Sequence, residues 1–429
     1  MNILITGASG FAGAWITKEV TEQGHQVVAA VRDTHYTKKL FPHAKIVACD
    51  FVQDVNPEVW LPRLDNIDII INCIGIFYHS DAKIMWAIHY DTPKALFTAA
   101  TKSNIKRIIH LSALGIERYQ SDYAKSKKAI EDYLFTLNIT TVILRPSFIY
   151  GPASEGGMAL MRALAAFPAV IPVAGSGLQQ FQPIHVEDLA KAVSNIINNN
   201  INESIILPAV SAKPITLKEI LLTLRDWLQI KRGYCLSIPL KLIKIGAKVG
   251  DYLPFSTINT PAIAMLEQGN IATPEESKKF IQIAGIKPKD FVEGAYQIPS
   301  KNPDRWYARL FFVKPLLRLS LAFMWLASAI VSAFLFPKAS SYFLLAKVGV
   351  NSYWQPTLLY LASLINGMIG LSLLFNYKTK LNCLLQIMVM TAYTIIITLK
   401  IPYLWLEPFG SIVKNIPVLI SIIILYLME

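Results

Sequence analysis

The sequence predicts a doubly wound parallel α/β sheet followed by an all-α transmembrane four-helix bundle. Two observations carry this prediction. In about the first 150 residues, short apolar strands alternate with helical stretches, the pattern of a parallel sheet covered by helices on both faces. Residues 311–429 are strongly apolar and hold eight of the 41 basic residues but only two of the 29 acidic ones. Such a shift is typical of membrane segments flanked by lysine and arginine.

The composition excludes several classes of protein. Charged residues make up 16% of the chain, against about 25% in a typical soluble domain, which excludes a disordered or acidic solvating protein. Half of the net charge of +12 belongs to the apolar C-terminal part, so the basic balance does not indicate nucleic-acid binding. The four cysteines stand far apart without a CxxC pair, so no metal site or disulfide framework is expected.

The N-terminal part is expected to contain six strands before residue 150. They are Ile3–Thr6, Gln26–Val31, Ala44–Ala48, Ile67–Ile71, Ile105–Ser112 and Thr140–Leu144. The first helix, Phe11–Gln23, ends at Gly24, a favourable residue at a helix C-terminus. Farther along, the pattern predicts a strand at Glu203–Leu207 and a helix at Leu217–Ile230, then amphipathic helical stretches at 239–250 and 260–270.

Three uncharged apolar runs are long enough to cross a membrane. Residues 319–336, 357–375 and 381–399 hold 18, 19 and 19 residues, which cover about 27–29 Å as helices, close to the roughly 30 Å hydrocarbon core. A fourth run approaches this length only as 412–428, which includes Lys414. Asn366 and Gln386 lie inside the runs, where polar side chains usually face the interior of the bundle.

A glycine-rich motif, Thr6–Gly13, stands between the first strand and the first helix. Gly7 allows a tight turn, Gly10 lets the backbone approach a pyrophosphate, and Gly13 permits close packing of helix on strand. The helix N-terminus then offers free N–H groups to phosphates. The motif predicts a dinucleotide site; the alternative is a glycine-rich turn without a ligand. The residues expected to contact the cofactor here are Gly7, Ser9, Gly10, Phe11 and Gly13.

The second strand ends in Val31-Arg32-Asp33. Arg32 can pair with a 2′-phosphate, which favours NADP(H). In the alternative, Arg32 is a solvated surface residue and Asp33 binds the ribose of NAD(H).

A second motif is Tyr123-Ala124-Lys125-Ser126-Lys127. With it, residues 1–230 resemble the extended and atypical short-chain dehydrogenase/reductases, which are NAD(P)-dependent proteins of the Rossmann fold. Their TGxxGxxG matches Thr6–Gly13, and their YxxxK matches Tyr123 and Lys127. Further landmarks follow in order as Asp50-Phe51, Asn72–Gly75, Ser112–Gly115, Leu144–Pro152 and Gln182–Asp188. The resemblance implies that the adenine end and the nicotinamide end of the cofactor contact Asp50, Phe51, Cys73, Ile74, Gly75, Lys127 and Pro146.

The number of residues between Ser112 and Tyr123 is small. In this the chain most resembles the atypical branch of the family, which contains the NADPH-binding accessory subunit of respiratory complex I. The short interval disfavours a nucleotide-sugar epimerase, because those enzymes usually have a longer insertion there. The C-terminal segment resembles a DoxX-like membrane domain in Pro408-Phe409-Gly410 and Lys414-Asn415-Ile416-Pro417.

Tyr123 and Lys127 lie four residues apart and so share one face of a helix. The resemblance implies that Tyr123 is the general acid/base, that Lys127 holds the ribose and lowers the tyrosine pKa, and that Ser112 binds the substrate carbonyl. A nearby ammonium favours phenolate, which agrees with this division. The alternative is that the three residues are structural, in a protein that binds nucleotide without turnover. For His89, a helix packed on the sheet is the favoured interpretation.

The function expected is a membrane-anchored NADP(H)-dependent oxidoreductase acting on an apolar or membrane-associated carbonyl or quinone. The alternative is a non-catalytic nucleotide-binding protein that stabilises or assembles a membrane complex, and a protein partner or oligomer is left open. The expected domains are 1–230 for nucleotide, 231–310 as substrate-side extension and linker, and 311–429 in the bilayer. Without a signal peptide, the N-terminal domain is expected in the cytoplasm, anchored to the inner membrane. The positive-inside rule agrees, through Lys301, Arg305, Arg309, Lys314 and Arg318.

Overall fold

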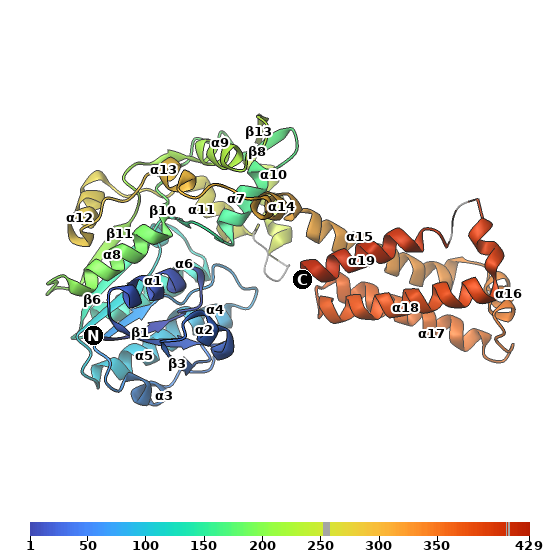
Figure 1. The fold of residues 1–429 in the computed structure, drawn as a ribbon, viewed down its shortest axis with the longest axis horizontal. Coiled ribbons are helices and arrows are strands. Elements are labelled where there is room, and N and C mark those ends of the chain that lie inside the picture. The colour runs from blue at the N-terminus through green and yellow to red at the C-terminus, as the bar shows by residue number, and fades with distance from the viewer. Residues whose placement is uncertain (252–257, 409, 411) are drawn as a thin grey trace. The chain divides into compact units, whose positions relative to one another are not determined.

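The computed structural model of the chain describes residues 1–251, 258–408, 410 and 412–429. It divides into two compact units, Met1–Ala308 and Arg309–Glu429. The first unit contains every strand of the described chain, and the second consists of helices (Figure 1).

The first unit is built on a seven-stranded sheet with the order β11-β6-β5-β4-β1-β2-β3. All neighbouring strands in it are parallel. The strands are β1 (Asn2–Thr6), β2 (Gln26–Val31), β3 (Lys45–Ala48), β4 (Ile69–Asn72), β5 (Arg107–Leu111), β6 (Thr140–Pro146) and β11 (Ile205–Ala209). The chain order reverses between β1 and β4, so their carboxyl ends flank the switch point where such sheets bind ligands. The predicted doubly wound sheet is confirmed.

Side chains of β1 alternate between two hydrophobic cores, one on each face of the sheet. Ile3 and Ile5 join the core with α1 (Phe11–Glu22), α8 (Val186–Asn198) and α12 (Pro274–Ala284). Leu4 joins the core with α3 (Pro57–Trp60), α5 (Thr92–Thr101) and α6 (Asp122–Phe135) on the opposite face. Both faces of β1 are therefore dry, which explains its continuous apolar sequence.

The chain beyond β6, apart from α8, β11 and α12, forms a smaller region of the same unit, with its own hydrophobic core. Its strands pair in twos, β7 with β10, β9 with β12 and β8 with β13. These strands are β7 (Ile149–Tyr150), β8 (Val170–Ala174), β9 (Gln180–Phe181), β10 (Ile184–His185), β12 (Ile215–Thr216) and β13 (Tyr234–Ile238). The helices are α7 (Gly157–Ala165), α9 (Leu217–Trp227), α10 (Leu240–Gly250), α11 (Thr260–Gln268), α13 (Phe291–Tyr296) and α14 (Asn302–Leu310).

Three helices of the second unit are long and apolar enough to cross a membrane, Val313–Leu335, Gln355–Leu374 and Thr379–Lys400. The first of them is α15 (Val313–Ile330) continued by a π-helical turn, and the others are α17 and α18. A surface helix, α16 (Lys338–Lys347), was not expected from the sequence. The last helix, α19 (Asn415–Met428), has 14 residues. Whether the fourth run spans stays a prediction.

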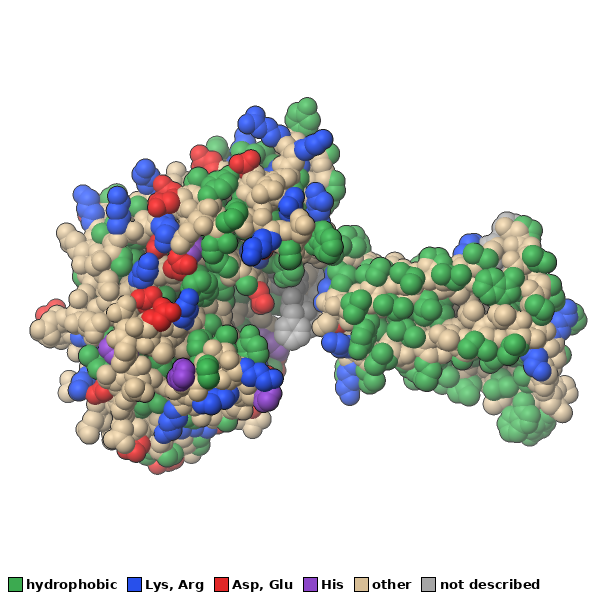
Figure 2. Space-filling model, viewed as in Figure 1, with side chains coloured by type: hydrophobic (Ala, Val, Ile, Leu, Met, Phe, Trp, Pro, Cys, Tyr) green, Lys and Arg blue, Asp and Glu red, His purple; other side chains and the backbone are tan. Residues whose placement is uncertain are grey.

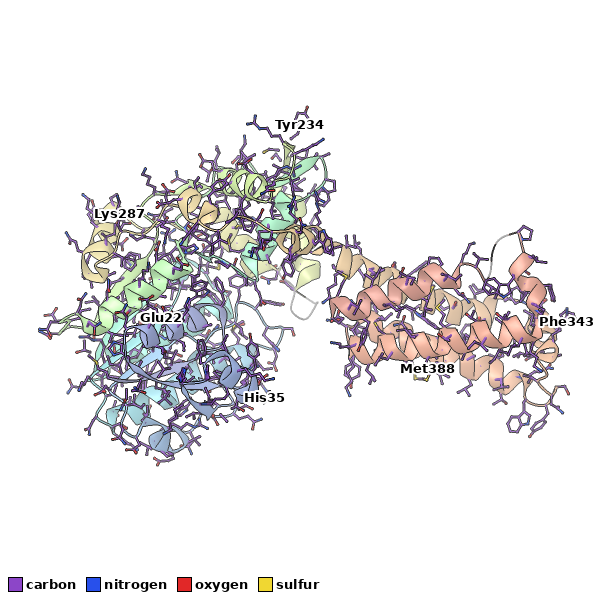
Figure 3. The ribbon with its side chains drawn as sticks, viewed as in Figure 1. Glu22, His35, Tyr234, Lys287, Phe343 and Met388 are labelled. Carbon is purple, nitrogen blue, oxygen red and sulfur yellow. The ribbon has the colours of Figure 1, made fainter. Side chains whose placement is uncertain are left out.

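The outer surface of the second unit is apolar, as expected of a domain in lipid. Hydrophobic side chains cover most of the face seen in Figure 2. Met388 is 63% exposed on α18 (Figure 3). Inside the bundle, Trp325 donates to Gln386 (2.8 Å), Gln386 to Asn382 (2.6 Å), and Asn382 to the carbonyl of Ile369 (3.1 Å). Gln386 therefore faces the interior and links three helices.

Candidate functional site

The turn after β1 can be built only with glycine at its key positions. Gly7 has φ +67°, and its N–H bonds Ala30 O at 3.1 Å. A Cβ on Gly13 would lie 2.1 Å from Gly7 O, so α1 packs against the turn more closely than any side chain allows. Gly10, at the N-cap of α1, supplies no side-chain cap. The first N–H groups of a 12-residue helix thus face the turn, an arrangement suited to a pyrophosphate.

Arg32 and Asp33 follow β2 and are both exposed. Asp33 Oδ1 accepts the N–H of Tyr36 at 2.8 Å and caps α2 (Thr34–Leu40). Within the described chain, Arg32 makes no hydrogen bond or ion pair. His35, on the first turn of α2, is exposed as well (Figure 3). The carboxylate is therefore engaged locally, while the guanidinium is available to a ligand.

Asp50 and Phe51 follow β3, and the structure separates their side chains. Asp50 is exposed, and its Oδ1 accepts the N–H of Val52 at 2.9 Å. The ring of Phe51 is buried in the core against Trp60, with centroids 6.5 Å apart. Of the two residues expected to contact an adenine, Asp50 alone presents its side chain to solvent.

Cys73, Ile74 and Gly75 follow β4, the strand next to β1. A Cβ on Gly75 would lie 3.5 Å from both Lys127 Nζ and His89 Nε2. Gly75 thus brings the end of β4 to the helix that carries the candidate catalytic pair. Pro146 ends β6, and its carbonyl accepts the N–H of Leu114 at 2.9 Å.

The structure brings Lys127 to the backbone that precedes Ser112. Lys127 Nζ donates to Leu111 O at 3.0 Å. Ser112 is 5% exposed, and its Oγ is buried without a hydrogen-bond partner in the described residues. A buried hydroxyl without a partner is costly, so it fits a position that a ligand's oxygen completes.

Tyr123 lies on the first turn of α6 in a largely apolar surrounding. Its ring centroid lies 5.1 Å from that of Phe77. Tyr123 packs against a small core that includes Tyr119 and Ala124, and Ala264 and Met265 of α11 pack against the same core. Lys127 Nζ lies 6.0 Å from the Tyr123 ring. The sequence alone could not show that α11, about 140 residues farther on, shares this core with the tyrosine.

Burial controls the electrostatics of the pair. Desolvation raises the pKa of Tyr123, whereas the resemblance implied a lowered value. Desolvation lowers the pKa of Lys127 to about 8, although the nearby Glu131 carboxylate raises it. Glu131 itself is 1% exposed and forms two hydrogen bonds with Arg145. The tyrosine is therefore held as a neutral phenol beside an ammonium with a depressed pKa.

His89 is a part of this site whose role the sequence did not reveal. It lies in a π-helical segment, η2 (Ala87–Asp91), and is 2% exposed. Nε2 accepts the N–H of Ile76 at 3.1 Å, and Nδ1 lies 3.0 Å from Ser126 Oγ. Burial, and then the charge of Lys127, lowers its pKa well below the ordinary value. The imidazole is neutral and joins the loop after β4 to α6.

A second buried network crosses the sheet. Thr6 Oγ1 donates to Asn72 Oδ1 at 2.5 Å, and Asn72 Nδ2 donates to His110 Nδ1 at 2.9 Å. His110 Nε2 is buried without a partner in the described chain. Burial and the charge of Lys127 lower the pKa of His110 as well. These side chains couple the ends of β1 and β4 to β5.

Comparison with known protein families agrees with both units. Residues 3–207 match the NAD dependent epimerase/dehydratase family, and residues 322–423 match the DoxX-like family. The resemblances noted from the sequence are therefore confirmed: the chain joins an epimerase/dehydratase-type N-terminal domain to a DoxX-like membrane domain. Of the short motif at 408–410, Phe409 lies outside the described residues.

Several curated proteins are similar to the N-terminal part. They include the chloroplastic divinyl chlorophyllide a 8-vinyl-reductase of Arabidopsis thaliana, 23% identical over 52% of this chain and 57% of the relative. Ceramide reductase of Caulobacter vibrioides is 28% identical over 44% of this chain and 58% of its own. The mitochondrial NADH dehydrogenase (ubiquinone) 1 alpha subcomplex subunit 9 of Arabidopsis thaliana is 25% identical over 44% and 48%. The chain thus spans about half the length of these relatives.

Solved structures share the fold. The UDP-glucose 4-epimerase of Thermotoga maritima with UDP-glucose has a TM-score of 0.53 at 15% identity and covers 73% of this chain and 100% of its own. The UDP-glucuronic acid 4-epimerase of Bacillus cereus, in complex with UDP-glucuronic acid and NAD, has a TM-score of 0.53 at 16% identity, covering 72% and 100%.

Proposed function

We propose that this chain, in which an epimerase/dehydratase-type domain precedes a DoxX-like membrane domain, is a membrane-anchored NADP(H)-dependent oxidoreductase. Its substrate would be an apolar or membrane-associated carbonyl or quinone. The observation that carries the proposal is the hydrogen bond from Lys127 Nζ to Leu111 O. It joins α6, the helix of Tyr123, to the end of β5, which Ser112 follows. The glycine turn and the partnerless Ser112 hydroxyl, both at the carboxyl edge of the sheet, support the same site.

Bound NADPH would supply the hydride that reduces the carbonyl carbon. The Ser112 hydroxyl would donate a hydrogen bond to the carbonyl oxygen. Tyr123 would donate its proton to that oxygen, because its raised pKa keeps the phenol protonated at neutral pH. Lys127, fixed by Leu111 O, would hold the nicotinamide ribose.

The preference for NADP(H) rests on Arg32. A guanidinium can donate two parallel hydrogen bonds to one phosphate group. Asp33, the acid that would otherwise bind the ribose hydroxyls of NAD(H), already caps α2 with one oxygen. NAD(H) is the alternative cofactor.

An apolar substrate is supported by the surroundings of Tyr123. Phe77 packs against the ring, and Ala264 and Met265 pack against the same small core as Tyr123. A relative at 28% identity is named for a ceramide, which is a lipid. We propose that the bilayer holding 311–429 is the inner membrane and that residues 1–230 bind nucleotide on its cytoplasmic side. Residues 231–310 would be the substrate-side extension and linker.

The alternative, a nucleotide-binding protein without turnover, is favoured by the relative named as a subunit of NADH dehydrogenase. Full-length protein in lipid nanodiscs, tested with NADPH against long-chain ketones, ceramide precursors and quinone analogues, separates the two. Oxidation of NADPH that depends on one of these acceptors, and that Tyr123→Phe abolishes, supports the enzyme. NADPH binding without turnover of any acceptor favours the assembly protein.

A further inference from the structure

The smaller region of the first unit contains a partly open cavity of about 230 Å³. Its walls come from the loop after β7, from α7, α9 and α13, and from the start of α14. Among the described residues that line it, none is a candidate for cofactor binding or catalysis. Met158, Leu224, Trp227 and Ile298 make much of the wall apolar. This partly open cavity is distinct from the site around Tyr123.

A buried arginine lines this cavity without an acidic partner among the residues that the structure describes. Arg162, on α7, is 8% exposed. Its guanidinium donates to Ser154 Oγ at 2.9 Å and to the Ser154 carbonyl, which uses two of its five N–H donors. Within the described chain it forms no ion pair. Buried arginines are normally paired, because removing their charge from water is costly.

The nearest acids do not neutralise Arg162. Tyr307, Asp304 and Glu155 act on it through space, and none of them forms an ion pair with it in the described part of the chain. Asp304 Oδ2 instead accepts the N–H of Lys301 at 2.8 Å, at the start of α14. Burial lowers the pKa of Arg162, the direction expected of a cation that lacks a close counter-charge.

Arg225, on the neighbouring helix α9, shows how this region satisfies a buried arginine that has a structural role. It is 4% exposed, and its guanidinium donates to the carbonyls of Ala165, Phe167 and Lys231. Arg162 has no comparable set of carbonyls in the described residues. Its remaining donors are thus left for a ligand.

His185 supplies a second donor on the same cavity. It is 1% exposed, and its Nδ1 accepts the N–H of Glu187 at 3.4 Å, which places the ring proton on Nε2. Nε2 has no acceptor in the described chain. Burial lowers the pKa of His185, so the ring is neutral near pH 7. Lys301 and Asp304 also line the cavity. With Arg162 they give it a net charge of one positive unit, and His185 adds a neutral N–H donor, which suits a monoanion.

We propose that this cavity binds a small carboxylate, with its charged end at Arg162 and its apolar chain against Met158, Leu224 and Trp227. A carboxylate matches the planar guanidinium and its parallel donors. A volume of about 230 Å³ is below the roughly 300–1,000 Å³ of sites for drug-sized ligands, so the chain is short. The proposal does not depend on the oxidoreductase function.

The site is tested by measuring the affinity for hexanoate. Isothermal titration calorimetry uses full-length protein in nanodiscs, with empty nanodiscs as the baseline. Hexanol, which lacks the charge, and inorganic phosphate, which lacks the chain, are the comparison probes. We expect hexanoate to bind about tenfold or more tightly than either, the size of effect of one charge-assisted hydrogen bond. Equal or tighter binding of hexanol or phosphate, or no binding of hexanoate, overturns the proposal.

Two variants remove the site by different means. Arg162→Met deletes the cation at similar side-chain length, and Ala295→Phe fills the cavity while keeping the arginine. Each should weaken hexanoate binding about tenfold or more, and the exposed Arg232→Met should not. Tyr123→Phe should bind hexanoate like the unaltered protein, which keeps this test separate from that of the catalytic site. If Arg162→Met does not fold, Ala295→Phe decides: undiminished binding overturns the proposal.

Discussion

His89 Nδ1 lies 3.0 Å from Ser126 Oγ, three residues after Tyr123 on α6. Because Nε2 of the same ring accepts the N–H of Ile76, the proton of the neutral imidazole lies on Nδ1 and points to the serine. One buried ring thus joins the loop after β4 to the helix of the candidate catalytic pair. The geometry of the site depends on His89 staying neutral.

This dependence predicts acid sensitivity. The pKa values of His89 and His110 are both depressed in the folded chain, so below the ordinary value of about 6.5 the unfolded chain binds more protons. Stability should therefore be complete above pH 6.5 and fall as the pH drops toward 5. Thermal unfolding of the first unit, followed in the full-length protein between pH 5 and 8, measures this.

His89→Gln and His110→Gln should each reduce the slope of stability against pH below 6.5, because each removes one depressed group. His79 is half-buried and lies outside both buried networks, so His79→Gln is the matched control and should keep the slope. An unchanged slope in both buried variants would contradict the assignment.

The sequence predicted the sheet and the glycine turn because both follow local rules. The run Ile3–Ile5 indicates a strand buried on two faces, and Gly13 occupies a position where a Cβ would overlap Gly7 O. The network around His89 could not be predicted, since it joins residues that are 13 and 37 positions apart through side chains alone. The packing of Tyr123 and α11 against one small core is likewise a long-range relationship.

The type of a side chain, charged or apolar, did not predict whether Arg162 and Phe51 are buried. Arg162 stands in an ordinary amphipathic pattern on α7, where an arginine would usually be solvated. The fold instead buries it, at a cavity that α9 and α13 also line. Phe51 is the opposite case, because a residue expected at the cofactor lies in the core.

Arg32→Ala should erase most of the preference for NADPH over NADH. Losing a charge-assisted contact to the 2′-phosphate costs roughly ten- to a hundredfold in affinity for NADPH and leaves NADH binding nearly unchanged. Dissociation constants from nicotinamide fluorescence measure both. Lys39→Ala, an exposed basic residue on the adjoining helix α2, is the control for general loss of charge. Equal affinities in the unaltered protein would refute the preference.

Tyr123→Phe should leave NADPH binding nearly intact and lower turnover of any substrate found by about 10²–10⁴-fold, the usual contribution of a general acid. The comparison of kcat with the NADPH dissociation constant distinguishes lost proton transfer from lost folding. Phe77→Leu, which changes the ring beside Tyr123 but no proton donor, is a matched control and should keep most of the rate. If Tyr123→Phe turns over as fast as the unaltered protein, the tyrosine is structural.

The pKa of Lys127, about 8, predicts an alkaline limit for cofactor binding. Its ammonium is present below that pH and lost above it, so NADPH affinity should fall as the pH rises through about 8. Glu131 raises the pKa of Lys127, and Glu131→Gln should therefore move this fall to lower pH. Glu117→Gln alters the other carboxylate on Arg145 and should leave the limit in place. A pH-independent affinity across the range on either side of that pKa would exclude Lys127 as a cofactor contact.

The last prediction concerns the number of membrane crossings. Helix α19 has 14 residues, about 21 Å at 1.5 Å each, so it is short for a bilayer core of roughly 30 Å unless residues 412–414 extend it. The second unit nevertheless places Glu429 beside Lys314, with Nζ 3.3 Å from the carboxylate. Lys314 stands at the start of the first span, among the basic residues that the positive-inside rule keeps in the cytoplasm. Four crossings return Glu429 to that side, whereas three leave it outside. A reporter active only in the cytoplasm, fused after Glu429, should therefore be active. An inactive reporter on a full-length fusion in the membrane would show that α19 does not cross. The control variant is Lys314→Glu, which repels Glu429 without moving any span, and it should leave an active reporter active.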